Sequence, residues 1–390
     1  MKTVLKVIFL LAVLHSTVIA QTPETIHSYA KVRKSIDWYR QQQKLWKGEI
    51  DKSQTNANAW LNYFRVCRVL VRLDTTDKRT NEEKGSYLHG IVNDMEKAVP
   101  SSFEYNLARW ISVGLGDMSK VNYLQKAAEL QPDNPMLCSD MINWGEISRD
   151  IAKRDKYAKL WFTSGETSAG MLNYNYNVMA GLKENAILIT TGDNDTYPIW
   201  ILQAEKGFRK DIAVINTSLI MIKEYRDKLF KELGVAPLTY DPSASGELGA
   251  KFRNELLEIL TANETNRPVY LALTASNECE GKMLETNAAN LYLTGLAYEY
   301  SKTALDNTAL LKKNFEQNYA LDYLDRYFVA DISIDFVKHI NTNYVVPMVK
   351  LYDHYMLAGQ VQLADGVKQR VLKIVEGTDE ENEVKKYFKK

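Results

Sequence analysis

The residues best placed to do chemistry lie in one short polar run. The run follows an apolar segment, 186–191, that is typical of a buried strand, and it precedes a segment typical of a helix. It contains Gly192, Asp193, Asn194, Asp195 and Thr196. Two carboxylates with neutral oxygen neighbours suit a hard cation such as Mg²⁺ or Mn²⁺, which could in turn hold phosphate oxygens. The run is therefore a candidate metal site at Asp193 and Asp195.

The same run also has a purely structural interpretation. Asp195 or Thr196 could cap the N-terminus of the following helix, where Pro198 suits the first turn and a carboxylate complements the helix dipole. Capping needs one acid, whereas the run has two. The sequence therefore leaves two interpretations open. The loop could serve only to shape the fold, or it could bind a ligand or a metal.

Two further expected strands, 212–217 and 268–274, also end in polar residues. In open α/β sheets, ligands bind at the carboxyl ends of the strands. A shared polar crevice would gather the ligand-binding candidates Asp193, Asn194, Asp195, Thr196, Asn216, Thr274 and Glu278. Each of these residues taken singly is also explained by turn chemistry, because small polar residues commonly end strands. The crevice is a hypothesis about the group.

No complete catalytic constellation is present, so no catalytic residue is assigned. The histidines are far apart with no H-E-x-x-H pair, and neither a Gly-x-Ser-x-Gly elbow nor a Gly-rich phosphate loop occurs. Lys and Arg together number 49, as do Asp and Glu, and this balance argues against nucleic-acid binding. Whether the protein is an enzyme stays open, and a non-enzymatic role is favoured.

The three cysteines, Cys67, Cys138 and Cys279, form no metal-binding or disulfide pattern. We expect them to be small core residues. An oxidising compartment would allow one bridge, for which Cys67 and Cys138 are the better pair because both fall in the helical half.

The elements that must position the polar run predict a mixed α and α/β fold. Strands 186–191, 212–217 and 268–274 alternate with helices at 198–206 and 222–233, which indicates a small Rossmann-like parallel sheet. The helical regions before and after it are expected to flank this sheet. The predicted domains are 21–180 (helical repeats), 181–280 (α/β) and 281–390 (helical, with a helix pair at 345–375 turning at 358–360).

In the first helical region, the expected helix ends are spaced as in a repeat protein. Pro100 and Pro132 each follow the end of an expected helix, and their separation is close to the tetratricopeptide period of about 34 residues. Segment 124–135 resembles the second helix of such a repeat with its turn, and 58–64 resembles a first helix. The repeats are accordingly described as tetratricopeptide-like.

The N-terminus has the pattern of a cleavable secretory signal. Lys2 and Lys6 precede the apolar stretch 7–14, and Ala20 ends a small-residue cleavage site. No cysteine lies near position 20, so a lipoprotein is not expected. After residue 20 no apolar run is long enough to span a membrane. We expect an exported, soluble protein of the periplasm with a signal peptide at 1–20.

Several segments resemble a known family. They are Asn185 to Trp200, Arg209 to Leu219, Arg267 to Tyr270, and Leu293 to Tyr298. They are similar to the soluble C-terminal region of multi-spanning bacterial membrane proteins related to protein O-mannosyltransferases. The resemblance covers roughly 181–300, and segment 220–225 departs from the family's aromatic pattern. The membrane-embedded half, where a lipid-linked sugar would be used, has no counterpart here, so the resemblance does not imply glycosyltransferase activity.

Two functional hypotheses follow. The first is an accessory or scaffold protein of the bacterial envelope that binds a protein partner through its helical repeats, because stacked repeats present extended binding surfaces. A peptide-binding, chaperone-like module would share this architecture. The alternative is a glycan- or sugar-phosphate-binding domain, or an enzyme, that uses Asp193 and Asp195 with a divalent metal. Sequence leaves open the identity of the partner or ligand, the oligomeric state and which membrane the protein faces.

Overall fold

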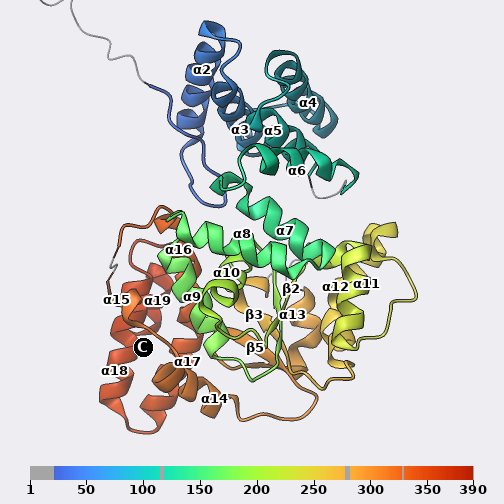
Figure 1. The fold of residues 1–390 in the computed structure, drawn as a ribbon. Coiled ribbons are helices and arrows are strands. Elements are labelled where there is room, and N and C mark those ends of the chain that lie inside the picture. The colour runs from blue at the N-terminus through green and yellow to red at the C-terminus, as the bar shows by residue number, and fades with distance from the viewer. Residues whose placement is uncertain (1–21, 115–117, 277–281, 327–328, 390) are drawn as a thin grey trace, which may run out of the picture. The chain divides into compact units, whose positions relative to one another are not determined.

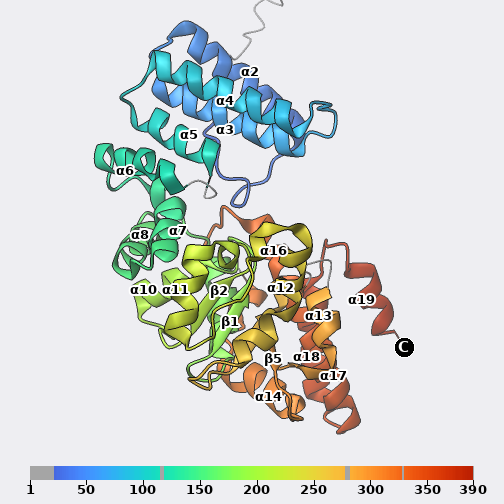
Figure 2. The same ribbon diagram turned by 90° about the vertical axis from the view of Figure 1, so that its right-hand side faces the viewer.

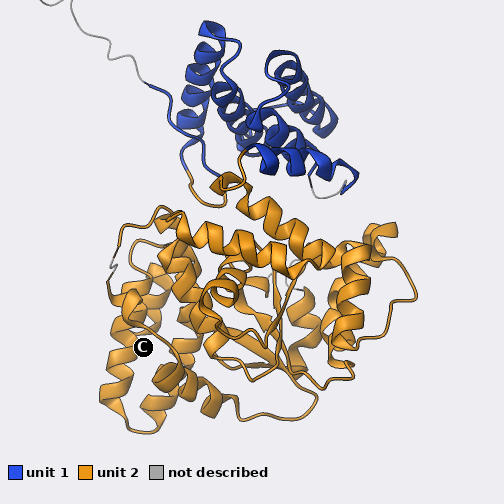
Figure 3. Cartoon of the chain, in the orientation of Figure 1, with its two compact units in different colours: residues 1–28, 34–130 blue, residues 29–33, 131–390 orange. Residues whose placement is uncertain are grey.

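The chain forms two compact units. The computed structural model describes residues 22–114, 118–276, 282–326 and 329–389. Unit 1 comprises residues 1–28 and 34–130, and unit 2 comprises residues 29–33 and 131–390 (Figure 3). The predicted signal peptide at 1–20 lies outside the described residues. The domain limits at 180 and 280 stay a prediction, because a helical domain and an α/β domain can share one compact unit.

Unit 1 is helical in its described part (Figure 1). Its helices are α2 (Ile36–Lys52), α3 (Ala57–Leu73), α4 (Asn81–Ala98), α5 (Phe103–Val113) and α6 (Val121–Leu130). The first four begin at a polar residue whose side chain accepts a hydrogen bond from a first-turn N–H: Ser35, Asn56, Thr80 and Ser102. Such caps satisfy donors that the helix itself leaves unpaired.

The helices of unit 1 pack as neighbouring pairs, α2 on α3 and α5 on α6. Their core includes Trp46, Phe64 and Trp110, which are all buried. The predicted helix ends before Pro100 and Pro132 are confirmed, since α4 ends at Ala98 and α6 at Leu130. The helical character of this region is thus confirmed, and the tetratricopeptide type of the repeat stays a prediction.

Unit 2 is built on a mixed five-stranded sheet. Its strands are β1 (Ile187–Thr190), β2 (Ala213–Asn216), β3 (Val269–Ala272), β4 (Leu291–Leu293) and β5 (Ala297–Tyr300), in the order β2-β1-β3-β5-β4. β1 pairs in parallel with β2 and β3, whereas β5 runs antiparallel to β3 and β4. The three predicted strands are confirmed. Their predicted parallel pairing is also found, but the sheet as a whole is mixed instead of parallel because β4 and β5 are added at one edge.

The antiparallel edge lies in a region where only helices were expected. β4 and β5 form a hairpin within 291–300, so the prediction of a helical region from 281 onward is wrong there. The hairpin turns at Gly295, whose φ of 153° and lack of a side chain are both needed. A Cβ atom at this glycine would lie 2.0 Å from the hydroxyl oxygen of Tyr319. A strand pair of this length leaves too short a pattern for periodicity to reveal.

Helices cover both faces of the sheet. α10 (Tyr197–Lys206) connects β1 to β2, and α11 (Lys223–Leu233) and α12 (Gly246–Thr261) lie between β2 and β3 in sequence. β2 and β3 lie on opposite sides of β1, so right-handed crossovers bring α10 and α12 to opposite faces, as Figure 2 shows. The remaining early helices of unit 2 are α7 (Cys138–Ser148), α8 (Ile151–Thr163) and α9 (Ala169–Ala180).

The C-terminal part of unit 2 is again helical after β5. Its helices are α14 (Asn307–Lys313), α15 (Asp322–Asp325), α16 (Ile334–Asn341), α17 (Val345–Leu357), α18 (Val361–Ile374) and α19 (Glu381–Tyr387). One more helix, α13 (Lys282–Asn287), precedes the hairpin. The predicted helix pair at 345–375 is confirmed: α17 packs on α18 and the chain turns at Gly359, where φ is 70°.

Two further expectations concern membranes and cysteines. Among the helices in the described ranges, none has both the length and the apolar character that crossing a membrane requires. Cys67 and Cys138 are both buried and both free in this structure. Cys279 lies outside the described residues.

Candidate functional site

The polar run at the end of β1 is organised around the carboxylate of Asp195. This side chain is 3% exposed. Its Oδ2 accepts a hydrogen bond from the main-chain N–H of Thr191 at 3.0 Å, and its Oδ1 accepts one from Gly192 at 2.7 Å. The Thr274 hydroxyl, just after β3, donates to Oδ2 at 2.5 Å. Asp195 therefore holds its own loop closed and ties the end of β1 to the end of β3.

A second set of hydrogen bonds joins this loop to the end of β2. The Thr196 hydroxyl oxygen lies 2.8 Å from that of Thr190 and accepts a hydrogen bond from Asn216 Nδ2 at 3.1 Å. Asn216 Nδ2 also donates to the Thr191 carbonyl at 3.0 Å. The carboxyl ends of the three parallel strands are thus cross-linked by side chains, of which Thr190, Asp195, Thr196 and Asn216 are buried and Thr274 is half-buried.

The predicted crevice residues come together only in part. Asp195 with Thr274, and Thr196 with Asn216, are in direct contact. Asp193 is exposed, and Asn194 points elsewhere: its Nδ2 donates to the carbonyl of Ala30 at 3.2 Å. Glu278 lies outside the described residues. Whether any member of the group binds a ligand stays a prediction.

The side chains of Asp195 and Thr196 do not cap helix α10. Thr196 is the N-cap residue of α10, but its side chain makes no capping hydrogen bond. Asp195 binds N–H groups that precede it in the chain instead of N–H groups of the helix. The predicted helix cap at Asp195 or Thr196 is therefore wrong, and the hydrogen bonds of Asp195 close the loop that precedes the helix. Pro198 does lie in the first turn of α10, as expected.

The two acids of the run have different electrostatic roles. Burial raises the pKa of Asp195, while its hydrogen bonds from Thr274 and from the two backbone N–H groups oppose that rise. Its Oδ2 accepts two hydrogen bonds, and its Oδ1 accepts one from Gly192 and a longer one from Thr196 at 3.4 Å, so protein donors already use most of its acceptor positions. In the described part of the chain, no three His, Cys, Asp or Glu residues are grouped as a metal site requires. Of the two acids, Asp193 is the exposed one.

Sequence reasoning missed the residue that supports the loop from behind. Asn175, on α9, is fully buried, and its Nδ2 donates to the carbonyl of Asn194 at 2.8 Å and to that of Met171 at 2.9 Å. A single asparagine within a helix gives no sequence signal for such a contact, because its target is distant in the chain.

The family comparison falls on this part of the chain. Residues 171–235 match the model of TMEM260-associated domain 2. The match begins in α9, contains β1, the Asp195 loop, α10 and β2, and ends just after α11. It therefore includes Asn175 and the loop that Asn175 supports. A search of the curated proteins found no match.

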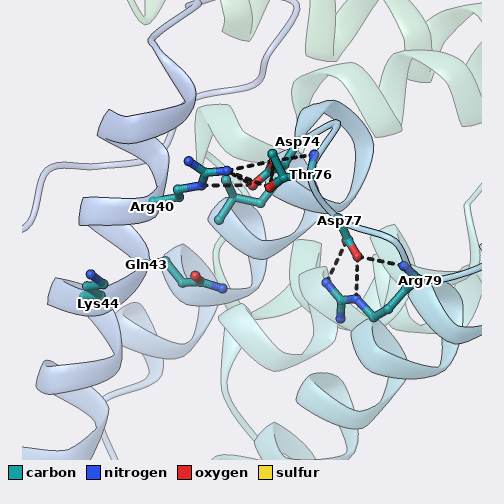
Figure 4. A pocket seen from close by; sticks show the side chains of 8 residues that line it. Arg40, Gln43, Lys44, Asp74, Thr76, Asp77 and Arg79 are labelled. Atoms are coloured by element: carbon teal, nitrogen blue, oxygen red, sulfur yellow. Dashed lines mark hydrogen bonds and ion pairs between the residues drawn. The ribbon is translucent and has the colours of Figure 1, made fainter.

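Unit 1 contains a pocket that the sequence did not indicate. It has a volume of about 350 Å³ and lies between α2 and the segment that links α3 to α4 (Figure 4). Its lining residues are Arg40, Gln43, Lys44, Leu70, Asp74, Thr76, Asp77 and Arg79. The spacing of Arg40, Gln43 and Lys44 places them on one face of α2, but nothing in the sequence pairs that face with residues 74–79.

Four of the charged residues that line this pocket form two ion pairs, and the fifth is a lysine without an ion-pair partner among the described residues. Arg40 Nη2 donates to Asp74 Oδ2 at 2.8 Å. Arg79 Nε and Nη2 donate to the two oxygens of Asp77 at 2.9 and 2.8 Å. Lys44 is exposed and makes no ion pair with any residue that the structure describes. The pocket thus combines two ion pairs with one exposed lysine.

The ion pair between Asp77 and Arg79 lets us predict the pH at which Asp77 takes up a proton. The side-chain hydrogen bonds from Arg79 lower the pKa of Asp77 from 3.8 to about 2. A carboxyl whose folded-state pKa is depressed stabilises the fold above its unfolded pKa, and this contribution is lost as the pH falls through about 2. Carboxyl NMR titration should therefore give a midpoint for Asp77 near 2, and Arg79→Gln should raise it. A wild-type midpoint at the ordinary value would show that the pair does not form.

Proposed function

We propose that this chain is an exported accessory or scaffold protein of the bacterial envelope that binds a protein partner through unit 1. The observation that supports the proposal best is the charged pocket between α2 and the segment 74–79. It is open to a ligand, whereas the polar groups at the sheet edge in unit 2 are mostly engaged with one another. A surface of helices is also the kind of scaffold on which proteins present partner-binding grooves.

The pocket is suited to a polar segment of a protein. Arg40 with Asp74, and Arg79 with Asp77, are already held in place, so a ligand meets fixed charges and little ordering is needed when it binds. Leu70 adds an apolar contact to the lining. Lys44 supplies a positive charge that an acidic side chain of the partner would complement.

The resemblance to the mannosyltransferase-related family belongs to the same proposal. The match of residues 171–235 to a TMEM260-associated domain supports a relationship for the α/β part of unit 2. We propose that this part is a relative of the soluble region of those membrane proteins. We propose further that the chain works in the periplasm.

Reversing one pocket charge tests the proposed function. Tagged wild-type chain, Lys44→Glu and Lys47→Glu are used to capture partners from the native envelope. Lys47 lies on the same helix outside the pocket and pairs with Asp51, so it is a matched control. We expect a defined partner with wild type and Lys47→Glu, and a loss of about tenfold with Lys44→Glu, which corresponds to about 1.4 kcal/mol. No reproducible partner, or equal recovery by all three proteins, would contradict the proposal.

A further inference from the structure

The turn between α17 and α18 carries an exposed apolar surface that we call the hairpin tip, residues 356–363. Every residue in this range is exposed. The exposed fractions of its large apolar side chains are 44% for Met356, 90% for Leu357, 52% for Val361 and 48% for Leu363. These are four of the nine large apolar residues that are exposed in the described part of the chain, so the tip is a concentration of them.

The hairpin does not need these side chains in order to close. Tyr355 and Ala364 are buried between the two helices, at 2% and 0% exposure. The main-chain N–H of Gln360 donates to the carbonyl of Tyr355 at 2.8 Å, and Gly359 supplies the left-handed turn. Leu357 and Val361 therefore project from a turn that other residues already hold.

The hairpin tip itself has no charged side chain, and the nearest charged residues lie on the helices behind it. The sequence has no Asp, Glu, Lys or Arg between Asp353 and Asp365, although exposed helix ends are usually charged. Behind the tip, lysines lie on three helices: Lys350 on α17, Lys368 on α18, and Lys312 and Lys313 at the end of α14, which contacts α17.

The acids in the same zone are largely engaged. Asp353 accepts hydrogen bonds from the Tyr387 hydroxyl at 2.7 Å. Glu316 accepts one from the Tyr355 hydroxyl at 2.6 Å and lies 3.8 Å from Lys312. Asp365 is exposed. The pattern is an uncharged apolar end with a mixed, lysine-containing rim.

We propose that the hairpin tip docks on a lipid surface. Its apolar side chains would enter the boundary between headgroups and acyl chains, and the lysines behind it would remain at the level of the headgroups. A second copy of the chain is a poorer occupant, because a stable interface buries roughly 1,200 Å² or more and the tip is a single short turn. A lipid surface accepts a protruding apolar turn without a matching groove. This proposal is independent of the pocket in unit 1.

Vesicle sedimentation with the full chain tests this proposal. The probes are vesicles of phosphatidylcholine alone and of phosphatidylcholine with phosphatidylglycerol. We expect the wild type to sediment with both, more strongly with the anionic vesicles, and Leu357→Asp to reduce sedimentation at least about tenfold. Val346→Asp is the matched control: it introduces the same charge at a position of α17 that is 56% exposed, three turns from the tip.

Each other outcome overturns the proposal. They are no sedimentation of the wild type, equal sedimentation of Leu357→Asp, or an equal loss in Val346→Asp. Concentration-dependent dimerisation that Leu357→Asp abolishes, without vesicle binding, would assign the tip to a second copy. Unchanged circular dichroism of both variants establishes that the exposed substitutions leave the fold intact.

Discussion

Replacing Glu146 with alanine should destabilise unit 2 by about 3 to 5 kcal/mol, because it leaves two largely buried arginines without their common partner. Glu146, on α7, is 1% exposed. Its carboxylate contacts Arg149 Nη1, accepts a hydrogen bond from Arg154 Nη1 at 2.9 Å, and accepts another from the Tyr225 hydroxyl at 3.0 Å. The carboxylate thereby connects α7, α8 and α11.

The effect should depend on burial as well as on charge. Glu232 also pairs with Arg149, at 2.6 Å, but its side chain is 46% exposed. Glu232→Ala should therefore cost less than about 1 kcal/mol. Glu146→Gln keeps the shape of the side chain and should fall between these values. Native-state hydrogen exchange of the α7 and α11 amides measures each change within unit 2, and similar values for Glu146→Ala and Glu232→Ala would refute this interpretation.

Asp195→Ala should cost about 2 to 4 kcal/mol, since it leaves the N–H groups of Thr191 and Gly192 and the Thr274 hydroxyl without their acceptor. Hydrogen exchange of β1 and α10 amides reports the loss. Asp193→Ala is the matched control in the same loop, and its exposure predicts a cost below about 1 kcal/mol.

Cation binding by this loop stays a separate hypothesis with its own test. If Asp193→Asn abolished binding of Mg²⁺ or Mn²⁺ measured by calorimetry while the stability stayed unchanged, the loop would be a ligand site. If Asp195→Ala left the exchange rates unchanged, the hydrogen bonds around its carboxylate would not be what closes the loop.

The sequence predicted the centre of unit 2 well because local signals there agree. β1 is an apolar run that ends at a polar, glycine-containing turn, and Pro198 marks the start of α10, so their limits were found within one or two residues. β4 and β5 were missed because three- and four-residue strands have no readable period, and their hairpin depends on the contact between Gly295 and Tyr319.

The site was harder to predict than the fold, because its contacts join distant segments. The sequence placed Asp195 and Thr274 at one sheet edge, and their hydrogen bond is there. It could not show that both carboxylate oxygens of Asp195 would accept hydrogen bonds from N–H groups of its own loop. The pocket in unit 1 depends on α2 meeting residues 74–79, and the Glu146 cluster depends on three helices, so neither has a local pattern.

Site-resolved photo-crosslinking in the native envelope tests the proposed function most directly. A photoreactive amino acid is placed at Lys44 in the unit 1 pocket, and in separate proteins at Lys47 and at Asp193. We expect one defined protein adduct from position 44, with a much weaker one from the other two positions. An adduct from position 193 and none from position 44 would contradict partner binding through unit 1 and would direct attention to the sheet edge.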